Sequence, residues 1–458
     1  MSDWKEYKLD ELVEITSSKR IMRSEYQENG IPFFRSKEII ELNSGNEITT
    51  ELFISKERFL EIKNKFGTPS YGDILLTSVG TLGVPYFVNY KEEFYFKDGN
   101  LTWFRKFNNI LRSKYLYYWF SSPVGRKALK EITIGSTQPA LTITGLKSLT
   151  IHLPTLEEQD YIIEILDHLS SKIHLNTQIN KTLEQIAQAL FKSWFVDFDP
   201  VRAKVQALSD GLNLEQAELA AMQAISGKTP EELTALSQIQ PECYAELAET
   251  AKAFPCEMME VDGVEVPKGW EVLNANDVIE FNPKETLKKD TLAYYLDMAS
   301  LPTQGCSPDL PILRKFTSGT RFRNGDTLFA RITPCLENGK TAFIQYLPEG
   351  TVAWGSTEYI VMRTKGIIPK PYSYLLARYE SFREYAIRSM TGTSGRQRTQ
   401  LDIIETYKVV SPSDNKLWES FSKIINPIFE TINSNTNKNI TLYNIRDLLL
   451  PKLLNEVI

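Results

Sequence analysis

Several short motifs in this chain have residue types suited to catalysis, but none has the spacing that its chemistry requires. Gly339-Lys340-Thr341 matches the end of a phosphate-binding loop, yet the glycine that such a loop needs earlier in the motif is replaced by Pro334. Asn282-Pro283-Lys284 lacks the aromatic residue that would complete a motif for adenine methylation. No Gly-x-Gly-x-x-Gly run follows an expected strand, so a dinucleotide or methyl-donor fold has no support.

Residues that bind metals or act as nucleophiles are scattered along the chain. The cysteines form no Cys-x-x-Cys pair, the histidines are not four residues apart, and Asp309 has no well-spaced Glu-x-Lys partner for a metal nuclease. A Gly-x-Ser-x-Gly elbow is missing, although spacing alone leaves a Ser/His/Asp or Cys/His arrangement open. The residues concerned are Cys243, Cys256, Cys306, Cys335, His152, His168 and His174. The sequence predicts incidental thiols and no metal or acid–base site, which is typical of a protein that recognises its ligand.

The length and composition are those of an ordinary globular protein. At 458 residues the chain is long enough for about two to four domains with a sizeable core. No apolar run is long enough to span a bilayer. The segment from Met1 to Glu6 is polar and has no signal-peptide core, so we expect a cytoplasmic protein.

The net charge of −6 is unevenly distributed along the chain. Residues 1–155 hold 21 Lys+Arg against 18 Asp+Glu, and residues 266–412 hold 19 against 15. Residues 156–265 hold 7 against 20, while residues 413–458 hold 5 of each sign. Because the acidity lies in one connecting segment, the two larger and mildly basic segments are compatible with nucleic-acid binding. A solvated surface also carries surplus lysines, so the charge permits this function without requiring it.

Long helices are expected to position the two larger segments. Residues 156–195 place apolar side chains three and four positions apart without an intervening Pro or Gly, which predicts one long amphipathic helix. Thr155 is the expected N-cap. Asn176 and Asn180 lie in or beside the apolar seam, where buried amides tend to fix the register of paired helices.

The end of the chain repeats this helix at a constant offset. Asn435 and Asn439 occupy the places of the two asparagines, within the same apolar stripe. A polar break shared between two apolar stripes is harder to obtain by chance than two leucine-rich helices. Pro427, inside the second copy, is expected to kink or delay that helix.

The two larger segments also repeat one order of features. Residues 72–77 match residues 325–330 as a Gly-Asp turn followed by a strand, and residues 149–154 match residues 407–412 as a strand closing on proline. This pattern predicts two domains with one fold and different specificities. The expected organisation is a first mixed α/β domain (1–155), a first long helix (156–199), an acidic helical insert (200–265), a second domain (266–412) and a second long helix (413–458). Within the insert, helices are expected over residues 213–225, 230–237 and 243–253.

Four stretches carry the most specific motifs of the chain. They are Gly325-Asp-Thr-Leu-Phe-Ala-Arg-Ile-Thr-Pro-Cys-Leu-Glu-Asn-Gly-Lys-Thr-Ala342, Leu153-Pro-Thr-Leu-Glu-Glu-Gln159, Gly392-Thr-Ser-Gly-Arg-Gln-Arg398 and Phe191-Lys-Ser-Trp-Phe-Val-Asp-Phe198. Through them, nearly the whole chain resembles the specificity subunits of type I restriction–modification enzymes.

The resemblance implies both a fold and a function. The fold would be α+β, with two similar α/β target-recognition domains alternating with two long conserved helices, which pack as an antiparallel coiled-coil pair with pseudo-two-fold symmetry. The chain would be a non-catalytic DNA-specificity subunit, and each domain would recognise one half of a bipartite site in double-stranded DNA. Methyltransferase (modification) subunits would dock on the helices and methylate adenine, and a motor-nuclease (restriction) subunit would join them for cleavage in phage defence. The resemblance implies that S-adenosylmethionine, ATP and Mg²⁺ bind to these partners. It implies no cofactor and no membrane association for this chain.

The length of the helices offers a physical reason for a split site. A helix of about forty residues is about 60 Å long at 1.5 Å per residue. Two such helices side by side could hold the recognition domains about one duplex turn apart, roughly 34–36 Å. We therefore expect the helices to act as a ruler, so that a few residues inserted or deleted near Asn176 change the spacer and leave both half-sites the same.

The DNA-contacting residues are expected in loops that follow equivalent strands of the two domains. Gln pairs bidentately with adenine and Arg with guanine, whereas Ser, Thr and Lys more often hold phosphates. Arg396 and Arg398 are the strongest candidates because they flank an amide in a glycine-containing loop. Turn chemistry alone would also place Gly, Ser and Thr at many of these positions. The full set is Ser78, Thr81, Gly83, Ser136, Thr137, Gln138, Arg331, Lys340, Thr393, Arg396, Gln397 and Arg398.

Other interpretations of the sequence remain open. Trp194 and Phe195, at the end of the first helix, either form a docking surface for a partner or seal the helix against a domain. The acidic insert leaves room for a further partner but favours none. A stand-alone nuclease or methyltransferase would need a motif that the chain lacks, and a helical scaffold with two protein-binding adaptor domains would have no DNA specificity. Salt-sensitive binding of duplex DNA separates a DNA-recognition subunit from such an adaptor.

Overall fold

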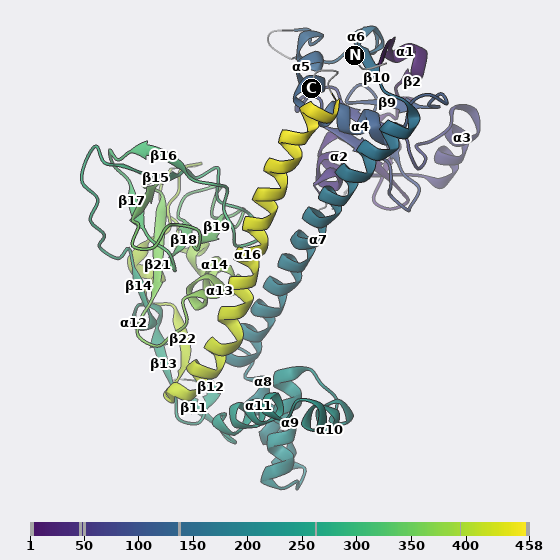
Figure 1. The fold of residues 1–458 in the computed structure, drawn as a ribbon. Coiled ribbons are helices and arrows are strands. Elements are labelled where there is room, and N and C mark those ends of the chain that lie inside the picture. The colour runs from purple at the N-terminus through teal and green to yellow at the C-terminus, as the bar shows by residue number, and fades with distance from the viewer. Residues whose placement is uncertain are drawn as a thin grey trace. The chain divides into compact units, whose positions relative to one another are not determined.

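The computed structural model describes residues 4–44, 48, 52–135, 139–261, 263–393 and 395–454. The chain forms two compact units: unit 1 comprises residues 1–175 and 438–458, and unit 2 comprises residues 176–437. Each unit contains one mixed α/β domain and one end of each long helix (Figure 1). Among the described residues, no helix is long and apolar enough to cross a membrane.

Unit 1 is built around short strands that form two sheets and one ladder. The strands are β1 (Lys5–Lys8), β2 (Glu14–Thr16), β3 (Tyr26–Gln27), β4 (Ile31–Phe34), β5 (Phe53–Ile54), β6 (Ile74–Thr77), β7 (Pro85–Phe87), β8 (Tyr95–Phe96), β9 (Leu101–Arg105) and β10 (Thr150–Leu153). The main sheet is antiparallel with the order β2-β9-β6-β7, the second has the order β3-β5-β4-β8, and β1 pairs with β10. The helices are α1 (Leu9–Leu12), the 3-10 helix η1 (Arg23–Glu25), α2 (Ser36–Asn43), α3 (Lys56–Phe66), α4 (Ser113–Ser121), α5 (Pro123–Glu131) and α6 (Ile143–Ser148).

The strand β6 lies inside the main sheet, and all four of its side chains are buried. Ile74 and Leu76 belong to a core cluster that includes Phe120 of α4. Leu75 belongs to a different cluster, with Phe96 of the second sheet. Because successive side chains of a strand point to opposite faces, β6 joins the helices on one side to the second sheet on the other. Its position is therefore set by packing on both faces.

Unit 2 contains the second domain and the insert. Its strands are β11 (Met258–Val261), β12 (Val264–Pro267), β13 (Trp270–Asn274), β14 (Ile279–Phe281), β15 (Leu292–Leu296), β16 (Ile312–Lys315), β17 (Thr320–Phe322), β18 (Thr327–Ala330), β19 (Thr341–Phe343), β20 (Ala353–Gly355), β21 (Tyr359–Thr364) and β22 (Lys408–Pro412). The main sheet has the order β14-β21-β18-β19, the second has the order β16-β15-β20-β17, and β13 pairs with β22. The domain's helices are α12 (Ala275–Val278), α13 (Pro371–Arg378), α14 (Glu380–Arg388) and α15 (Leu401–Ile404).

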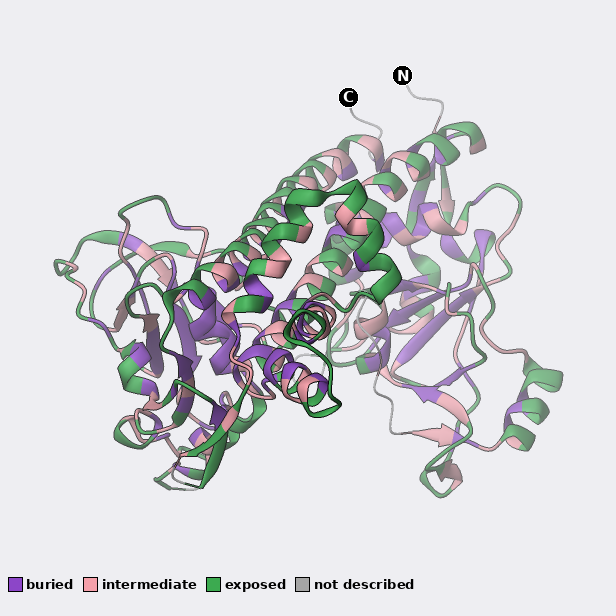
Figure 2. Ribbon diagram, turned by 90° about the horizontal axis from the view of Figure 1, so that it is seen from below, coloured by how far each residue is buried: buried purple, intermediate pink, exposed green. Residues whose placement is uncertain are grey.

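The two domains share the topology of their main sheets and closing ladders, which confirms the internal repeat predicted from the sequence. The main sheets β2-β9-β6-β7 and β14-β21-β18-β19 match strand for strand, and so do the closing ladders β1-β10 and β13-β22. Residues 72–77 and 325–330, which the sequence aligns, supply β6 and β18 at the same place in each sheet. Figure 2 shows these strands buried, while the outward faces of the helices are exposed.

The long helix expected over residues 156–195 is α7 (Leu156–Phe195), and its repeat is α16 (Asn415–Leu454). Thr155 caps α7 as expected: its Oγ1 accepts a hydrogen bond from the backbone N–H of Glu158 at 3.3 Å, and Glu158 Oε2 accepts one from the backbone N–H of Thr155 at 3.0 Å. The expectation that Pro427 delays the second helix is wrong, because α16 begins at Asn415 and continues through it. Proline removes one donor from the helical ladder without ending this helix.

Buried asparagines lie in the seam of the helix pair in each unit. In unit 2, Asn435 Nδ2 donates to Asn180 Oδ1 at 3.0 Å, and Asn180 Nδ2 donates to Thr436 Oγ1 at 3.3 Å. In unit 1, Asn439 Nδ2 donates to the backbone oxygen of Ile173 at 3.4 Å. Since an amide in an apolar seam is costly unless it is paired, these contacts favour one register of the helices.

The acidic insert is helical, as the sequence predicts. The three expected helices are α9 (Leu214–Ser226), α10 (Pro230–Ile239) and α11 (Pro241–Ala253), and α8 (Asp199–Ser209) precedes them where no helix was expected. The strands β11 and β12 then form a hairpin before the second domain. Val201, Met222 and Phe254 belong to the main core cluster of unit 2, so apolar packing anchors the insert in that unit.

Replacing Asn435 with alanine tests the polar contact in unit 2. Asn435→Ala should lower the free energy of unfolding by about 1–3 kcal/mol, because Asn180 loses a partner inside the seam. Asn426→Ala is the matched control, since Asn426 lies on the same helix and its amide donates to Ser422 one turn earlier on that helix. The control should change stability by less than about 0.5 kcal/mol. Urea unfolding of both variants gives the comparison, and equal losses would contradict the role of the seam.

Candidate nucleic-acid interface

In unit 1, two polar loops lie side by side at the end of β6. The backbone N–H of Leu141 donates to the backbone oxygen of Ser78 at 3.0 Å, and Val79 forms a β-bridge with Ala140. Ser78 and Val79 belong to the loop that follows β6, whereas the other two residues end the loop that precedes α6. The structure thus brings together the two loops in which the sequence analysis placed the candidate residues of the first domain.

The same pair of loops meets in unit 2, at the end of β18. The backbone N–H of Thr399 donates to the backbone oxygen of Arg331 at 2.9 Å. Thr333 and Gln397 exchange two hydrogen bonds, because the Thr333 N–H donates to the Gln397 oxygen and Thr333 Oγ1 accepts from the Gln397 N–H, both at 3.0 Å. The repeat of the fold therefore produces one repeated loop pair per domain.

An ion pair holds part of the loop pair in unit 2. Arg398 donates to the Glu358 carboxylate from Nε and Nη2, at 2.7 to 3.1 Å, and Arg331 Nε lies 4.0 Å from the same carboxylate. The hydrogen bonds from Arg398 keep the pKa of Glu358 below its ordinary value, although partial burial opposes this. Two predicted DNA-binding arginines therefore share one acidic partner, which neutralises part of their charge.

Arg396 is held differently. Its backbone N–H donates to the Thr393 oxygen at 2.9 Å, which closes a tight turn, and Gly395 within that turn has φ +77°. Glycine adopts this left-handed conformation without a steric cost. The side chains of Thr393 and Arg396 are exposed, so this turn presents a guanidinium to solvent. Among the predicted residues, Arg396 is the cation best placed to contact an anionic ligand.

Two predicted residues are engaged inside the chain. Ser78 is buried, and its hydroxyl lies 2.7 Å from Thr102 Oγ1 and donates to the Leu76 oxygen at 3.2 Å. Lys340 Nζ donates to the backbone oxygens of Met298 and Ala299 at 2.7 and 3.0 Å. The expectation of a direct DNA contact is corrected for Ser78, which is buried and hydrogen-bonded within the chain, and Lys340 holds a neighbouring loop in place.

The remaining candidates of unit 1 are described only in part. Thr81 is exposed, and the backbone N–H of Gly83 donates to the Thr77 oxygen at 2.8 Å in a turn where Gly83 has φ +73°. Ser136, Thr137 and Gln138 lie outside the described residues.

Trp194 and Phe195 seal the end of α7 inside unit 2. Trp194 is fully buried with its ring 5.5 Å from that of Phe421, and Phe195 stacks on Trp418 at 4.8 Å. These contacts lie later in α7 and earlier in α16 than the Asn180 contact, so the two helix segments run antiparallel. The alternative of a docking surface is corrected, because neither ring is exposed for a partner.

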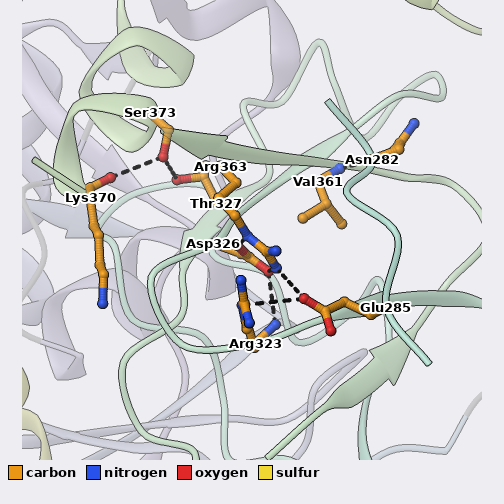
Figure 3. Close-up of polar contacts among 9 residues, drawn as sticks. All are labelled: Asn282, Glu285, Arg323, Asp326, Thr327, Val361, Arg363, Lys370 and Ser373. Atoms are coloured by element: carbon orange, nitrogen blue, oxygen red, sulfur yellow. Dashed lines mark hydrogen bonds and ion pairs between the residues drawn. The ribbon is translucent and has the colours of Figure 1, made fainter. Parts of the chain in front are cut away.

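A partly buried polar network holds the start of β18, the strand whose other end leads into the first loop of the pair (Figure 3). Arg363 donates to both carboxylate oxygens of Asp326, at 2.7 and 2.8 Å, and to Glu285 at 2.7 Å. Arg323 lies 3.2 Å from the same Glu285 oxygen. Burial raises the pKa of Asp326, and the hydrogen bonds from Arg363 oppose that rise. The network joins β18 to β21 and to the segment after β14 at the start of the strand that carries the loop.

Sequence reasoning missed this network, although the repeat contains a signal for it. Each domain has a Gly-Asp pair before its central strand, and the aspartate closes the preceding turn: Asp73 accepts from the Ser70 N–H at 2.9 Å and Asp326 from the Arg323 N–H at 2.8 Å. Nearby, Asn282 Oδ1 accepts from the Val361 N–H at 2.9 Å, so the Asn-Pro-Lys motif has a structural role (Figure 3).

Comparison with known proteins places the chain in a family. A model described as "Type I restriction modification DNA specificity domain" matches residues 1–185. The HindI specificity subunit of Haemophilus influenzae, a type I restriction enzyme subunit, is 36% identical, and the alignment covers 99% of both chains. The chain belongs to the family of type I restriction enzyme specificity subunits. The MjaIX specificity subunit of Methanocaldococcus jannaschii is 23% identical over 98% of this chain and 92% of that one.

A solved structure supports the fold. The specificity subunit of a type I restriction–modification system from M. genitalium matches with a TM-score of 0.51 and 14% identity, covering 100% of this chain and 97% of that one. The fold of the present chain, in which two domains alternate with two long helices, is therefore similar to that of a solved specificity subunit. The protein is a non-catalytic DNA-specificity subunit of a type I restriction–modification system, and the adaptor alternative is not favoured.

We predict that replacing Arg396 and replacing Arg398 have different effects on DNA binding by this specificity subunit. Arg396→Ala should weaken binding and reduce the salt slope by about 1, because one exposed cation no longer neutralises a phosphate. Arg398→Ala should weaken binding more, because it also removes the hydrogen bonds to Glu358 and leaves that carboxylate with only the more distant Arg331 to offset its charge. Adding Glu358→Gln to Arg398→Ala should restore part of the loss. Titration of a duplex target at several salt concentrations, with the complete complex, measures each effect.

Arg388→Ala serves as the matched control. Arg388 is exposed on α14 of the same unit and pairs with Glu384 on its own helix. Binding and salt slope should match those of the unaltered protein. An Arg396→Ala/Arg398→Ala variant with unchanged binding and an unchanged slope would remove this loop from the interface.

Proposed function

We propose that each unit of the chain recognises one half of a split DNA target through its own loop pair. The observation that carries this proposal is the repeat of the two adjoining loops at the ends of β6 and β18, on a shared topology. A repeated scaffold with different loops is a direct way to recognise two half-sites of different sequence.

The residues in the loops support different readout in the two halves. The unit 2 loops carry Arg331 after β18 and Arg396, Gln397 and Arg398 in the second loop, whereas unit 1 has Thr81 and Gly83 after β6 and, by sequence, Ser136, Thr137 and Gln138 in its second loop, so unit 1 has no arginine among its candidates. Arginine and glutamine side chains pair bidentately with guanine and adenine in the major groove, whereas hydroxyls hold phosphates or either base type. The second half-site should therefore depend on guanine or adenine positions that the Arg and Gln side chains contact.

The proposal extends to the rest of the complex. Methyltransferase subunits dock on the long helices and methylate adenine, and a motor-nuclease subunit joins them for cleavage. S-adenosylmethionine, ATP and Mg²⁺ act in those partners, in the cytoplasm. We further predict that the length of α7 and α16 sets the length of the spacer between the two half-sites.

Exchange of one domain with the Haemophilus influenzae relative tests the assignment of half-sites. A chimera with residues 1–155 from the relative should keep one half of the target and change the other. The reciprocal chimera, with residues 266–412 exchanged, should change only the half that the first one kept. Duplexes selected from a randomised pool by the reconstituted complex give both targets. Chimeras that change both halves together, or neither, would contradict one half-site per domain.

A further inference from the structure

Aliphatic side chains are exposed on and beside the strand β16, at the edge of unit 2's second sheet: Ile312 and Leu313 lie on β16, Leu310 precedes it, and Leu292 begins the paired strand β15. The exposed fractions are 60% for Leu292, 57% for Leu310, 61% for Ile312 and 58% for Leu313. All four residues of β16 are exposed, and among the strands of the described residues it pairs with β15 alone (Figure 1). An edge strand with exposed apolar residues is a template for another strand, so proteins normally cover or charge it.

The matching strand of unit 1 is covered by two further elements. The second sheets align as β5-β4-β8 and β16-β15-β20, because β4 and β15 each pair antiparallel with the first strand named and parallel with the last. In unit 1, β3 pairs with the outer edge of β5. In unit 2, no strand among the described residues pairs with the outer edge of β16, and β17 is added at the opposite edge, beside β20.

A helix that covers the sheet of unit 1 also has no counterpart in unit 2. Phe59 and Ile62 of α3 pack in one cluster with Phe33 and Tyr95, which face each other across β4 and β8. The corresponding pair in unit 2 is Tyr295 and Trp354, and the chain between β16 and β18 forms β17 where unit 1 has α3.

Arg314 lies over this pair in unit 2. Its guanidinium is 4.8 Å from the ring centre of Tyr295 and 5.7 Å from that of Trp354. One exposed arginine thus lies where unit 1 places a helix. Phe316 and Leu287 also pack in one cluster with Trp354, which is buried, so this face of the sheet is covered by neighbouring segments. What unit 2 lacks, among the described residues, is a strand on the outer edge of β16.

The charge around β16 indicates which kind of segment could pair with its outer edge. Lys288, Lys289, Arg314 and Lys315 are exposed, and within the described part of the chain none of them forms a salt bridge. Asp290 and Asp309 supply two carboxylates in this region, which still leaves a surplus of positive charge. A segment with aliphatic and acidic side chains would complement both features.

We propose that β16 is a docking site for an extended segment of a partner protein, which adds as a strand and carries acidic and aliphatic side chains. This inference rests on the proposed function, because it assigns the segment to the methyltransferase subunit of the complex. The alternation of an antiparallel ladder turns the backbone N–H groups of Leu313 and Lys315 away from β15, since Phe316 already donates to Thr291. The added strand would accept hydrogen bonds from these two groups.

A protein strand fits this edge better than the other occupants. The basic side chains alone would also suit DNA, but duplex DNA offers few contacts to the exposed aliphatic side chains and no acceptors in register with a strand edge. A second copy of this chain would place Arg314 and Lys315 near their own counterparts, and like charges across a strand pair are destabilising.

Hydrogen exchange on the reconstituted complex of this chain with its methyltransferase subunit tests the proposal. The amides of Leu313 and Lys315 should exchange at least about tenfold more slowly in the complex than in the free chain, before DNA is added. The amides of Ile312 and Arg314, which face β15, are internal references and should change less. Protection of Leu313 and Lys315 supports strand addition.

Charge and shape changes at the same strand provide a second measurement. The Leu313→Asp/Lys315→Glu variant should bind the methyltransferase subunit at least about tenfold more weakly, because it introduces acidic groups opposite acidic ones. Ile239→Asp is the matched control, since Ile239 is 76% exposed on α10 and should bind as the unaltered chain does. Both substitutions are at exposed positions, and unchanged circular dichroism confirms that each variant folds.

The outcomes separate this inference from the proposed function. A complex that forms without protection of β16 overturns the inference and leaves the proposed function standing. Protection that appears only with DNA, or only at high concentration of this chain alone, overturns it in favour of DNA or of a second copy. If the unaltered chain forms no complex with the methyltransferase subunit, both proposals fail.

Discussion

Hydrogen bonding by asparagine amides in the seam between the long helices is the constraint on which the arrangement of each unit depends. Asn180 and Asn435 bond to each other in unit 2, and Asn439 bonds to the backbone of α7 in unit 1. An apolar seam alone would tolerate helices sliding by a turn, whereas an unpaired buried amide would not. Each helix begins within a few residues of a closing strand, β10 or β22, so the register of the helices constrains where each domain is attached.

Within each domain, the packing of the buried central strand fixes where the loops begin. The central strands β6 and β18 have every side chain buried, because they pack against helices on one face and the second sheet on the other. In unit 2, the Arg363–Asp326 pair also fixes the start of β18. A loop that leaves such a strand begins from a rigid point, so differences between loops change what is recognised without changing the fold.

Most of the fold could be predicted from the sequence, because long helices and repeated strands leave periodic patterns. The period of α7 and α16, the shared asparagine break and the Gly-Asp pairs were all visible in the order of residues. The helix α8 was missed, since its short amphipathic pattern lies beside the end of α7. The uncovered edge of β16 could not be foreseen, because it depends on which strands pair across the sheet.

The candidate site was harder to predict, because loop side chains can turn towards solvent or back into the protein. Ser78 and Lys340 have suitable types for binding phosphate, yet each is hydrogen-bonded to the chain. Arg398 has a carboxylate partner 40 residues earlier in the sequence, Glu358, which no local pattern indicates. Arg396 fits the prediction best, since a glycine turn leaves its side chain exposed.

The most direct test of the central claim is a map of methylated adenines in cells that carry this chain with its methyltransferase subunit. The comparison is with cells that lack only this chain. If the chain selects the target, a split motif gains methylation only when it is present, and the motif itself reports both half-sites and the spacer. Identical methylation in both cells would show that the chain does not direct that methyltransferase and would contradict the account.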